Sequence, residues 1–428
     1  MKKIKIMLSF LILMLCFSFL APIGVVFAEE TEKPKEKIYV SLGDSISKGY
    51  AINLKEGFED ESATLITGEE NDYSFIENCY AYKLNGYLKQ YYGYNKGYNF
   101  AHNGDDCQDL INFISSFYDN VNEVCKNPND MNSKFNTLTN LEVYDILSNA
   151  QTISVCIGAN NILSEATDII TNYLGFQKDT TPRSYQQVEA LLRDKVESDF
   201  EPQFQKLLLL INSLNSKAEV YFTTIYNPYA VLQADEDLLN YLSSDETQNM
   251  IKNMYGYDLQ YFTQDRLTDI AYLSELAIQG GFDSTGRVFL GLNGVIKEEI
   301  NKSRANDDAN FYVVDSYSKF NEKKNPNSEY HNYINECLDK ITGETIAVWV
   351  MLNIDFTENI VMYMDPHPTY LGHNLIFETF KSNQIGTKYY QESNVNKTLV
   401  VILGISGFVL VLTLGSVIAL KITKNRVC

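Results

Sequence analysis

The chain has 428 residues, of which 35 are basic and 55 acidic, so its formal net charge is −20 at pH 7. Two terminal segments described below hold six of the basic residues and no acidic residue, so the part between them carries 29 basic against 55 acidic residues, a net charge of −26. Such a surface repels nucleic acid and anionic lipid head groups, which excludes nucleic acid as a partner. A solvated surface on a soluble domain is enough to explain the excess of acidic residues, without any specific role for them in recognition.

The first 28 residues have the pattern of a secretory signal peptide. Three lysines within the first five residues precede an apolar run over residues 6–20, and residues 26–28 supply small side chains at the expected cleavage position. An uncleaved anchor is the alternative interpretation. Residues 29–36 are then a linker.

The chain ends in a predicted transmembrane helix. Residues 399–420 form an uncharged run of 22 residues, which spans roughly 33 Å at helical rise; a buried core helix is the alternative. Basic residues in the tail, residues 421–428, place that tail in the cytoplasm. Residues 37–390 are therefore predicted to form an extracellular domain, joined to the membrane helix by a juxtamembrane linker at residues 391–398.

The cysteine pattern indicates neither a disulfide framework nor a metal site. Five cysteines lie between the two terminal segments, an odd number for so long a domain: Cys79, Cys107, Cys125, Cys156 and Cys337. A single disulfide bridge between two of Cys79, Cys107 and Cys125 is the alternative. The chain has no Cys-x-x-Cys or His-rich spacing, so no metal and no other cofactor is expected.

Buried strands alternate with helical patterns along the predicted domain. Five apolar runs rich in β-branched and aromatic residues predict strands at residues 38–42, 98–101, 152–157, 219–225 and 311–314. This alternation predicts an α/β fold with a mostly parallel sheet covered on both faces, ending in a helix at residues 371–381. Residues 53–71, 230–254 and 321–358 break the rhythm and are interpreted as surface insertions or lid elements.

Small and amide-bearing residues follow several of these strands. Gly43-Asp44-Ser45 follows the first strand, Gly104 the second, Gly158-Ala159-Asn160-Asn161 the third and Asn227-Pro228 the fourth. Because function in parallel sheets lies at the carboxyl ends of the strands, we expect these turns to meet at one edge.

Three side chains along the chain have the chemistry of nucleophilic acyl transfer. Ser45 offers a hydroxyl at a strand-to-helix turn, although Gly-Asp-Ser is also common in ordinary turns. Among four histidines, His367 is the best base, because it lies in the rigid turn Asp365-Pro366-His367-Pro368 with a carboxylate two residues away. The others are assigned to other roles: His373 to structure, His102 to packing or support, and His331 to solvent.

An acyl-transfer site also needs hydrogen-bond donors for the oxyanion. The amide of Asn160 and the backbone N–H groups of Gly104 and Ser45 have the right chemistry. Taken singly, an Asn such as Asn160 is more often a turn former.

The order of these motifs resembles that of the SGNH, or GDSL-type, hydrolase superfamily, and the chain is similar to a bacterial, membrane-anchored member. The resemblance implies Ser45 as nucleophile, His367 as general base, Asp365 as its acidic partner, and an oxyanion hole made by Ser45, Gly104 and Asn160. It also implies a flavodoxin-like three-layer α/β/α sandwich. The Gly-x-Ser-x-Gly motif of α/β-hydrolases does not occur around Ser45.

Two positions depart from the family pattern. Asn161 stands where the third motif usually has an acid, and we interpret it as a support for the turn. Asp365 lies two residues before His367, whereas the family places its aspartate three residues before, where this chain has Met364. A backbone carbonyl is the alternative partner that orients His367.

The sequence thus predicts an extracellular, membrane-anchored serine esterase that hydrolyses carboxylic esters, such as acyl groups on glycans or lipids, through an acyl-enzyme. A weakly active or inactive cell-surface binding module on the same fold and an acyltransferase with the same residues are the alternatives. Seven tyrosines crowd residues 80–98, which fits sugar stacking, but their helical spacing favours ordinary packing.

Overall fold

The computed structural model describes residues 36–50, 52, 73–175, 181–230, 244–245, 249, 253, 261, 263–306, 309–322, 354–355, 359–360 and 367–386. Contacts divide the chain into Met1–Lys37 and Ile38–Cys428, and everything below concerns the second unit. The predicted signal peptide, juxtamembrane linker, membrane helix and tail lie outside the described residues, as do Asp365, His331, Cys337 and most of the predicted insertions.

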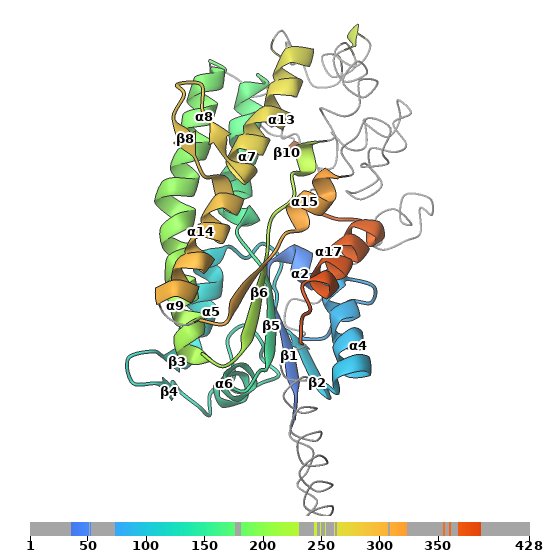
Figure 1. Cartoon of the computed structure of the whole chain (residues 1–428). Helices are drawn as coiled ribbons and strands as arrows, with labels where there is room; N and C mark the ends of the chain where they lie inside the picture. Colours follow the sequence, from blue (N-terminus) through green and yellow to red (C-terminus); the bar gives the residue numbers. More distant parts are fainter. Residues whose placement is uncertain are drawn as a thin grey trace, which may run out of the picture. The chain divides into compact units, whose positions relative to one another are not determined.

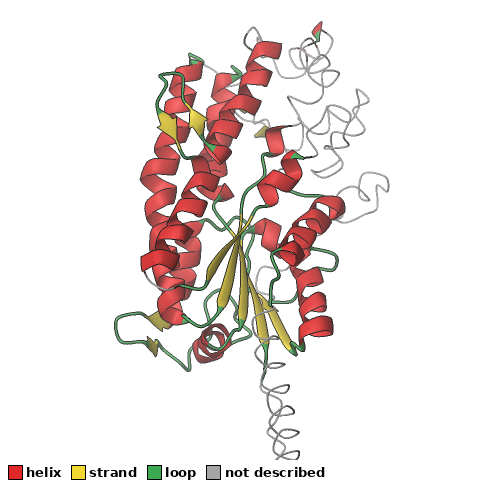
Figure 2. Cartoon of the chain, in the orientation of Figure 1, coloured by secondary structure: helices red, strands yellow, loops and turns green. Residues whose placement is uncertain are grey.

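Five parallel strands form the central sheet, in the order β2-β1-β5-β6-β9. Their bounds are β1 (Ile38–Gly43), β2 (Lys96–Asn99), β5 (Thr152–Cys156), β6 (Glu219–Thr223) and β9 (Phe311–Val314). Counted along the chain, these strands have the order 2-1-3-4-5, the flavodoxin-like arrangement. Figures 1 and 2 show helices on either side of the sheet. The predicted parallel sheet flanked by helices is confirmed.

The second strand differs from its prediction by two residues at each end. It was expected at residues 98–101 and is observed at Lys96–Asn99. The backbone N–H of Phe100 donates to the carbonyl of Ser41 (2.8 Å), and that of His102 donates to the carbonyl of Gly43 (3.0 Å). The chain therefore follows β1 beyond the last strand residue, and the buried Phe100 explains the apolar signal there.

Two groups of helices cover the two faces of the sheet. One face carries α4 (Tyr80–Tyr92) and α17 (Tyr370–Ser382), and the other carries α5 (Cys107–Phe117), α9 (Glu201–Leu214) and α14 (Gly291–Asn306) (Figure 1). Among the tyrosines of α4, Tyr80 is buried and stacks on Phe380 of α17, with ring centroids 5.4 Å apart, whereas Tyr82 and Tyr91 are 42% and 56% exposed. The packing interpretation therefore holds for Tyr80 and not for the exposed Tyr91.

A further group of helices extends past the carboxyl edge of the sheet. It contains α7 (Ala159–Tyr173), α8 (Tyr185–Asp194), the π-helical η1 (Lys195–Phe200) and α13 (Gln264–Gln279) (Figure 1). Plain strand–helix alternation would need only α9 between β5 and β6 and only α14 between β6 and β9. The additional helices therefore enlarge the fold at the edge where the predicted site residues lie.

The remaining elements are short connections: α2 (Ser45–Lys48), α6 (Asn140–Ser148), η2 (Pro228–Ala230), α15 (Ser316–Asn321), and the strand pairs β3 (Tyr118–Asp119) with β4 (Val124–Cys125), β7 (Gly281–Phe282) with β8 (Val288–Phe289), and β10 (Ile354–Asp355) with β11 (Asn359–Ile360).

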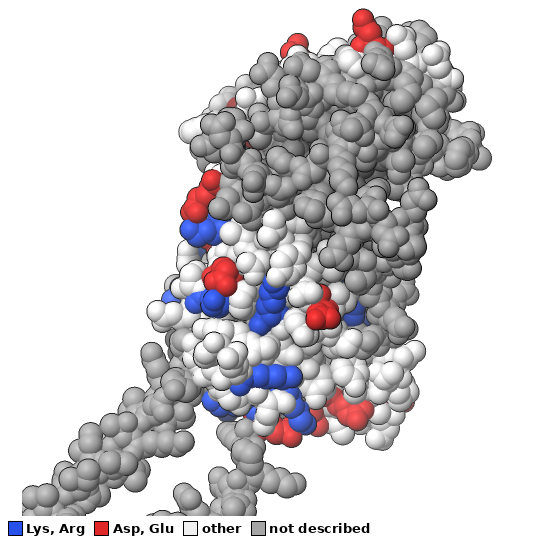
Figure 3. All heavy atoms as spheres, turned by 90° about the vertical axis from the view of Figure 1, so that its right-hand side faces the viewer, with Lys and Arg blue, Asp and Glu red and all other residues white. Residues whose placement is uncertain are grey.

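Three global properties of the described part bear on the sequence predictions. None of its helices is long and apolar enough to cross a membrane, and the predicted span at residues 399–420 lies outside it. The four described cysteines that lie between the terminal segments, Cys79, Cys107, Cys125 and Cys156, are free thiols. On the face shown in Figure 3, acidic and basic side chains are interspersed over the described surface.

Candidate active site

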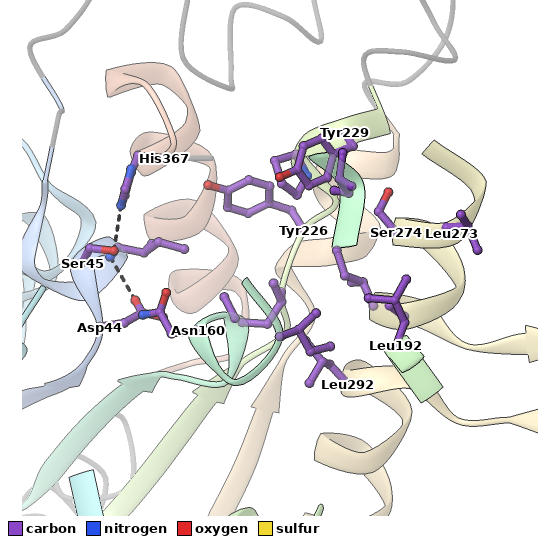
Figure 4. Close-up of a pocket in the computed structure, with 18 of the residues that line it drawn as sticks. Asp44, Ser45, Asn160, Leu192, Tyr226, Tyr229, Leu273, Ser274, Leu292 and His367 are labelled. Carbon is purple, nitrogen blue, oxygen red and sulfur yellow. Dashed lines mark hydrogen bonds between the residues drawn. The ribbon is translucent and has the colours of Figure 1, made fainter. Parts of the chain in front are cut away.

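The structure brings Ser45 and His367 into hydrogen-bond contact across 322 positions of sequence. Oγ of Ser45 lies 2.7 Å from Nε2 of His367 (Figure 4). Ser45 is the first residue of α2 and is separated from β1 only by Asp44, and His367 lies two residues before the N-cap of α17, Thr369. His367 is 7% exposed, so little water competes for this contact.

The turn that presents Ser45 depends on glycine at position 43. Gly43 has φ +126°, and a Cβ atom there would lie 1.9 Å from the carbonyl oxygen of Cys156 in β5. The next residue, Asp44, donates its backbone N–H to that same carbonyl (3.0 Å), and its carboxylate caps α2 by accepting from the N–H of Ile46 (2.9 Å). These contacts direct the chain away from β1 and leave Ser45 at the cavity surface.

Asp44 is a buried carboxyl group beside the nucleophile. Burial raises the pKa of Asp44 to about 7, although the N–H of Ile46 and the positive charge of a protonated His367 act in the opposite direction. Its Oδ2 atom is buried and has no hydrogen-bond partner within the described residues. Its proton is therefore easily gained or lost near neutral pH.

The predicted oxyanion donors lie around the same cavity as Ser45. Gly104 and Asn160 both line it. The Nδ2 group of Asn160 donates to the carbonyl of Asp105 (2.8 Å), which holds the side chain in place and leaves the second N–H of the amide for an oxyanion. Ser45 itself begins a helix, where the first N–H groups have no intrahelical acceptor.

Asn160 is placed by the turn that starts α7. Gly158 has φ +116°, and a Cβ atom there would lie 2.6 Å from the ring of Phe200. Asn161, which replaces the family's acid, is 2% exposed; it accepts from the N–H of Cys107 (3.1 Å) and donates to Gln203 (2.8 Å). It thus ties α7 to α5 and α9, in keeping with the support predicted for it.

The other two described histidines do not line the cavity. His102 contacts Asp105 at 3.3 Å (Nδ1 to Oδ1), and Asp105 also pairs with Lys134. His373 is fully buried and accepts from the N–H of Tyr80 (Nδ1, 3.3 Å). Burial lowers the pKa of His373 to about 3, so this ring stays neutral and serves structure, as predicted.

Ser45 and His367 open onto a cavity of about 440 Å³. Asp44, Ser45, Asn103, Asn160 and His367 lie at one end of it, and most of the remaining lining is apolar and comes largely from α7, α8 and α13 (Figure 4). Tyr226 is buried between these parts and stacks on Phe320 with ring centroids 4.3 Å apart. Figure 4 shows its hydroxyl pointing toward the side where Ser45 and His367 lie.

Sequence reasoning missed the apolar half of this cavity and the aromatic neighbour of the base. Residues 185–194 and 264–279 have apolar side chains at helical spacing, which identifies an amphipathic helix but not whether its face meets a core or a cavity. Tyr50, whose ring centroid lies 4.6 Å from that of His367, has no sequence signal of its own.

No group of three or more His, Cys, Asp or Glu side chains within the described residues could hold a metal ion. The described residues at this site supply a serine, a histidine, amide donors and the carboxyl group of Asp44. A serine–histidine pair with such donors at the edge of a flavodoxin-like sheet resembles the GDSL-type ester hydrolases, as the motifs do.

Comparison with known proteins gives low-identity structural likenesses. No protein-family model and no curated protein matches the chain. Among solved structures, an extracellular lipase from Streptomyces rimosus is 14% identical, over 81% of this chain and 99% of that chain, with a TM-score of 0.39. Phospholipase A1 from Streptomyces albidoflavus NA297 is 13% identical over the same shares, 81% and 99%, with a TM-score of 0.38.

A family two carbohydrate esterase from Clostridium thermocellum is 10% identical, over 82% of this chain and 64% of that chain, with a TM-score of 0.31. Likenesses of this size assign neither a substrate nor a site residue to the present chain.

Proposed function

We propose that the chain is an extracellular serine esterase, anchored to the membrane by residues 399–420, that hydrolyses carboxylic esters through an acyl-enzyme. The 2.7 Å contact between Ser45 Oγ and His367 Nε2 carries this proposal, because a serine hydroxyl becomes a useful nucleophile only beside a base. The signal-peptide pattern of residues 1–28 and the uncharged run near the C-terminus support the location.

The first half of the reaction forms the acyl-enzyme. His367 Nε2 accepts the hydroxyl proton as Ser45 Oγ attacks the ester carbonyl carbon, and the carbonyl oxygen becomes an oxyanion. The N–H groups of Ser45 and Gly104 and the side-chain amide of Asn160 donate to that oxyanion. The tetrahedral intermediate then collapses, the carbon–alkoxide bond breaks, and His367 gives its proton to the leaving alcohol.

The second half releases the acid. Water attacks the acyl-enzyme while His367 takes a proton from it, and the proton returns to Ser45 Oγ as the carboxylic acid leaves. Asp365 is proposed to orient His367 throughout. Asp365→Ala tests that role against orientation by a backbone carbonyl: loss of kcat on the order of 10³-fold or more supports Asp365, and unchanged kcat supports the carbonyl.

Substitution of the nucleophile tests the function. Ser45→Ala should lower kcat for p-nitrophenyl esters by on the order of 10⁴-fold or more and should abolish labelling by a fluorophosphonate probe. Ser116→Ala is the matched control, because Ser116 lies on α5 and donates to the carbonyl of Phe113, away from the cavity lining. Unchanged turnover and labelling in the Ser45 variant would reject the proposal, and a wild-type chain that never reacts with the probe would favour a binding module.

A further inference from the structure

The cavity beside Ser45 is strongly divided between polar and apolar walls. Beyond the nucleophile and its donors, most lining side chains are aliphatic: Ile170, Val188, Leu192, Ile270, Leu273 and Leu292 contribute from α7, α8, α13 and α14. The residues with polar groups in this part of the lining are Tyr173, Tyr226, Tyr229 and Ser274. Figure 4 shows Leu192, Leu273 and Leu292 on the side of the cavity opposite Ser45 and His367. A ligand that extends from the nucleophile therefore passes from a polar into an apolar environment.

A polar group in the apolar part is already satisfied by the protein. The hydroxyl of Ser274 lies 3.0 Å from Oδ1 of Asn227 and 3.0 Å from the carbonyl of Ala271. A sugar placed there would leave hydroxyl groups without partners, and each buried unpaired group costs about 1–3 kcal/mol. The lining therefore disfavours a polar occupant.

The dimensions match an extended chain. A volume of about 440 Å³ lies within the range of roughly 300–1,000 Å³ typical of small-molecule pockets. The lining residues of α7 run from Ala159 to Ile170, which at helical rise is about 17 Å. Because an extended chain advances roughly 1.2 Å per bond, this length corresponds to on the order of 14 bonds. A two-carbon acyl group would leave most of the cavity unused.

Polar contacts brace the cavity walls against one another. Arg193 of α8 pairs with Asp283 beside β7, with 2.6 Å between Nη1 and Oδ2. The hydroxyl of Tyr173, at the end of α7, donates to Asp269 of α13. These contacts hold the helices in position, so the apolar space is built into the fold and no rearrangement is needed to form it.

We propose that this pocket binds the acyl part of the substrate, and that the substrate is an ester of a long, unbranched fatty acid. The proposal rests on the esterase function proposed above and adds the substrate class. Leu192 is then a specificity-determining residue, because it lines the pocket, whereas its neighbour Leu191 is 39% exposed and does not line it.

A chain-length series on the purified full-length protein tests the substrate class. With p-nitrophenyl esters from acetate to dodecanoate, kcat/KM should rise about fourfold per added methylene while the chain remains inside the pocket. A kcat/KM that is highest for acetate and falls with every added carbon would overturn the inference and leave the esterase function standing.

Two matched substitutions localise the effect. Leu192→Phe narrows the pocket and should lower kcat/KM for dodecanoate at least about tenfold while leaving the acetate value within about twofold. Leu191→Phe, the same change one residue away, should leave both values unchanged. Leu273→Phe repeats the test from α13 if the Leu192 variant does not fold. Equal effects of Leu192→Phe and Leu191→Phe, or equal effects on both substrates, would contradict the assignment.

A binding measurement separates this inference from the proposed chemistry. The Ser45→Ala variant should bind dodecanoate in calorimetry, and the double variant with Leu192→Phe should bind it at least about tenfold more weakly. Such binding without any ester turnover by the wild type would reject the esterase function and retain the apolar pocket. Absence of dodecanoate binding by a folded Ser45→Ala protein would reject the pocket.

Discussion

Tyr50 contacts both members of the serine–histidine pair, Ser45 and His367. Its backbone N–H donates to the carbonyl of Ser45 (3.0 Å), and its ring lies against the imidazole of His367, with centroids 4.6 Å apart and planes tilted by 48°. The residue that closes the turn after the nucleophile therefore also limits where the base can lie.

Removal of the Tyr50 ring should reduce catalysis by loosening His367. For Tyr50→Ala we expect kcat to fall about tenfold or more, because misplacement of a catalytic group raises the barrier to reaction. Tyr50→Phe keeps the ring and should restore kcat. Steady-state kinetics with both variants check this; a Phe variant as impaired as the Ala variant would contradict a positioning role for the ring.

Substitutions of Asn160 and Asn161 should affect different properties, mainly catalysis for Asn160 and mainly stability for Asn161. Asn160→Ala removes an oxyanion donor and should lower kcat by about 10²-fold or more. It also removes one hydrogen bond to the carbonyl of Asp105, so its melting temperature should fall, but by less than that of Asn161→Ala. Asn161→Ala leaves the N–H of Cys107 and the amide oxygen of Gln203 without this partner, so it should mainly lower the melting temperature. Measurements of kcat and the melting temperature of both variants test this. A larger loss of kcat in the Asn161 variant and a larger loss of stability in the Asn160 variant would contradict the assignment.

The buried carboxyl of Asp44 should make stability depend on pH in a defined direction. Its pKa is about 7 in the folded chain against 3.8 for the ordinary carboxyl, so the folded state holds a proton that the unfolded state has lost between these values. The free energy of unfolding should therefore fall as pH rises from about 4 to about 7, by on the order of 4 kcal/mol from this group.

Asp44→Asn tests that slope, because asparagine keeps an oxygen for the N–H of Ile46 but does not titrate. In urea unfolding, the free energy of unfolding of the variant minus that of the wild type should increase from pH 5 to pH 8. Parallel curves for the two proteins would show that Asp44 does not control this dependence.

His373 should make the free energy of unfolding depend on pH in the direction opposite to that of Asp44, and at lower pH. Its pKa is about 3 in the folded chain against 6.5 for the ordinary ring, so the unfolded state takes up the proton first. The free energy of unfolding should fall as pH drops from about 6.5 toward 3, by on the order of 5 kcal/mol from this group.

His373→Gln should flatten this acid limb in unfolding experiments while lowering stability at pH 7, where the packed ring beside Tyr80 is lost. His102→Gln, at a partly exposed ring, is the comparison variant. An acid limb of unchanged steepness in the His373 variant would count against the assignment.

Local patterns were sufficient to predict most of the sheet. β9 matches its predicted range, residues 311–314, and β1 and β5 differ from theirs by one residue at the carboxyl end. The boundary of β2 was missed because Phe100 is buried beside β1 without belonging to the strand. A buried position usually holds an apolar residue whether it lies within the strand or just beyond it. Hydrophobicity alone therefore does not mark the last strand residue.

The sequence by itself determined the order of the chemistry: a Gly-Asp-Ser turn after the first strand, glycine and asparagine after the next two, and a histidine before the last helix. These are local signals, set by turn geometry and by the period of buried side chains. Only the tertiary structure decided that Ser45 Oγ meets His367 Nε2, that Asp44 is buried, and that Leu192 lines a cavity. The physical reason is that distances and cavities arise where elements far apart in sequence pack together, which no local pattern specifies.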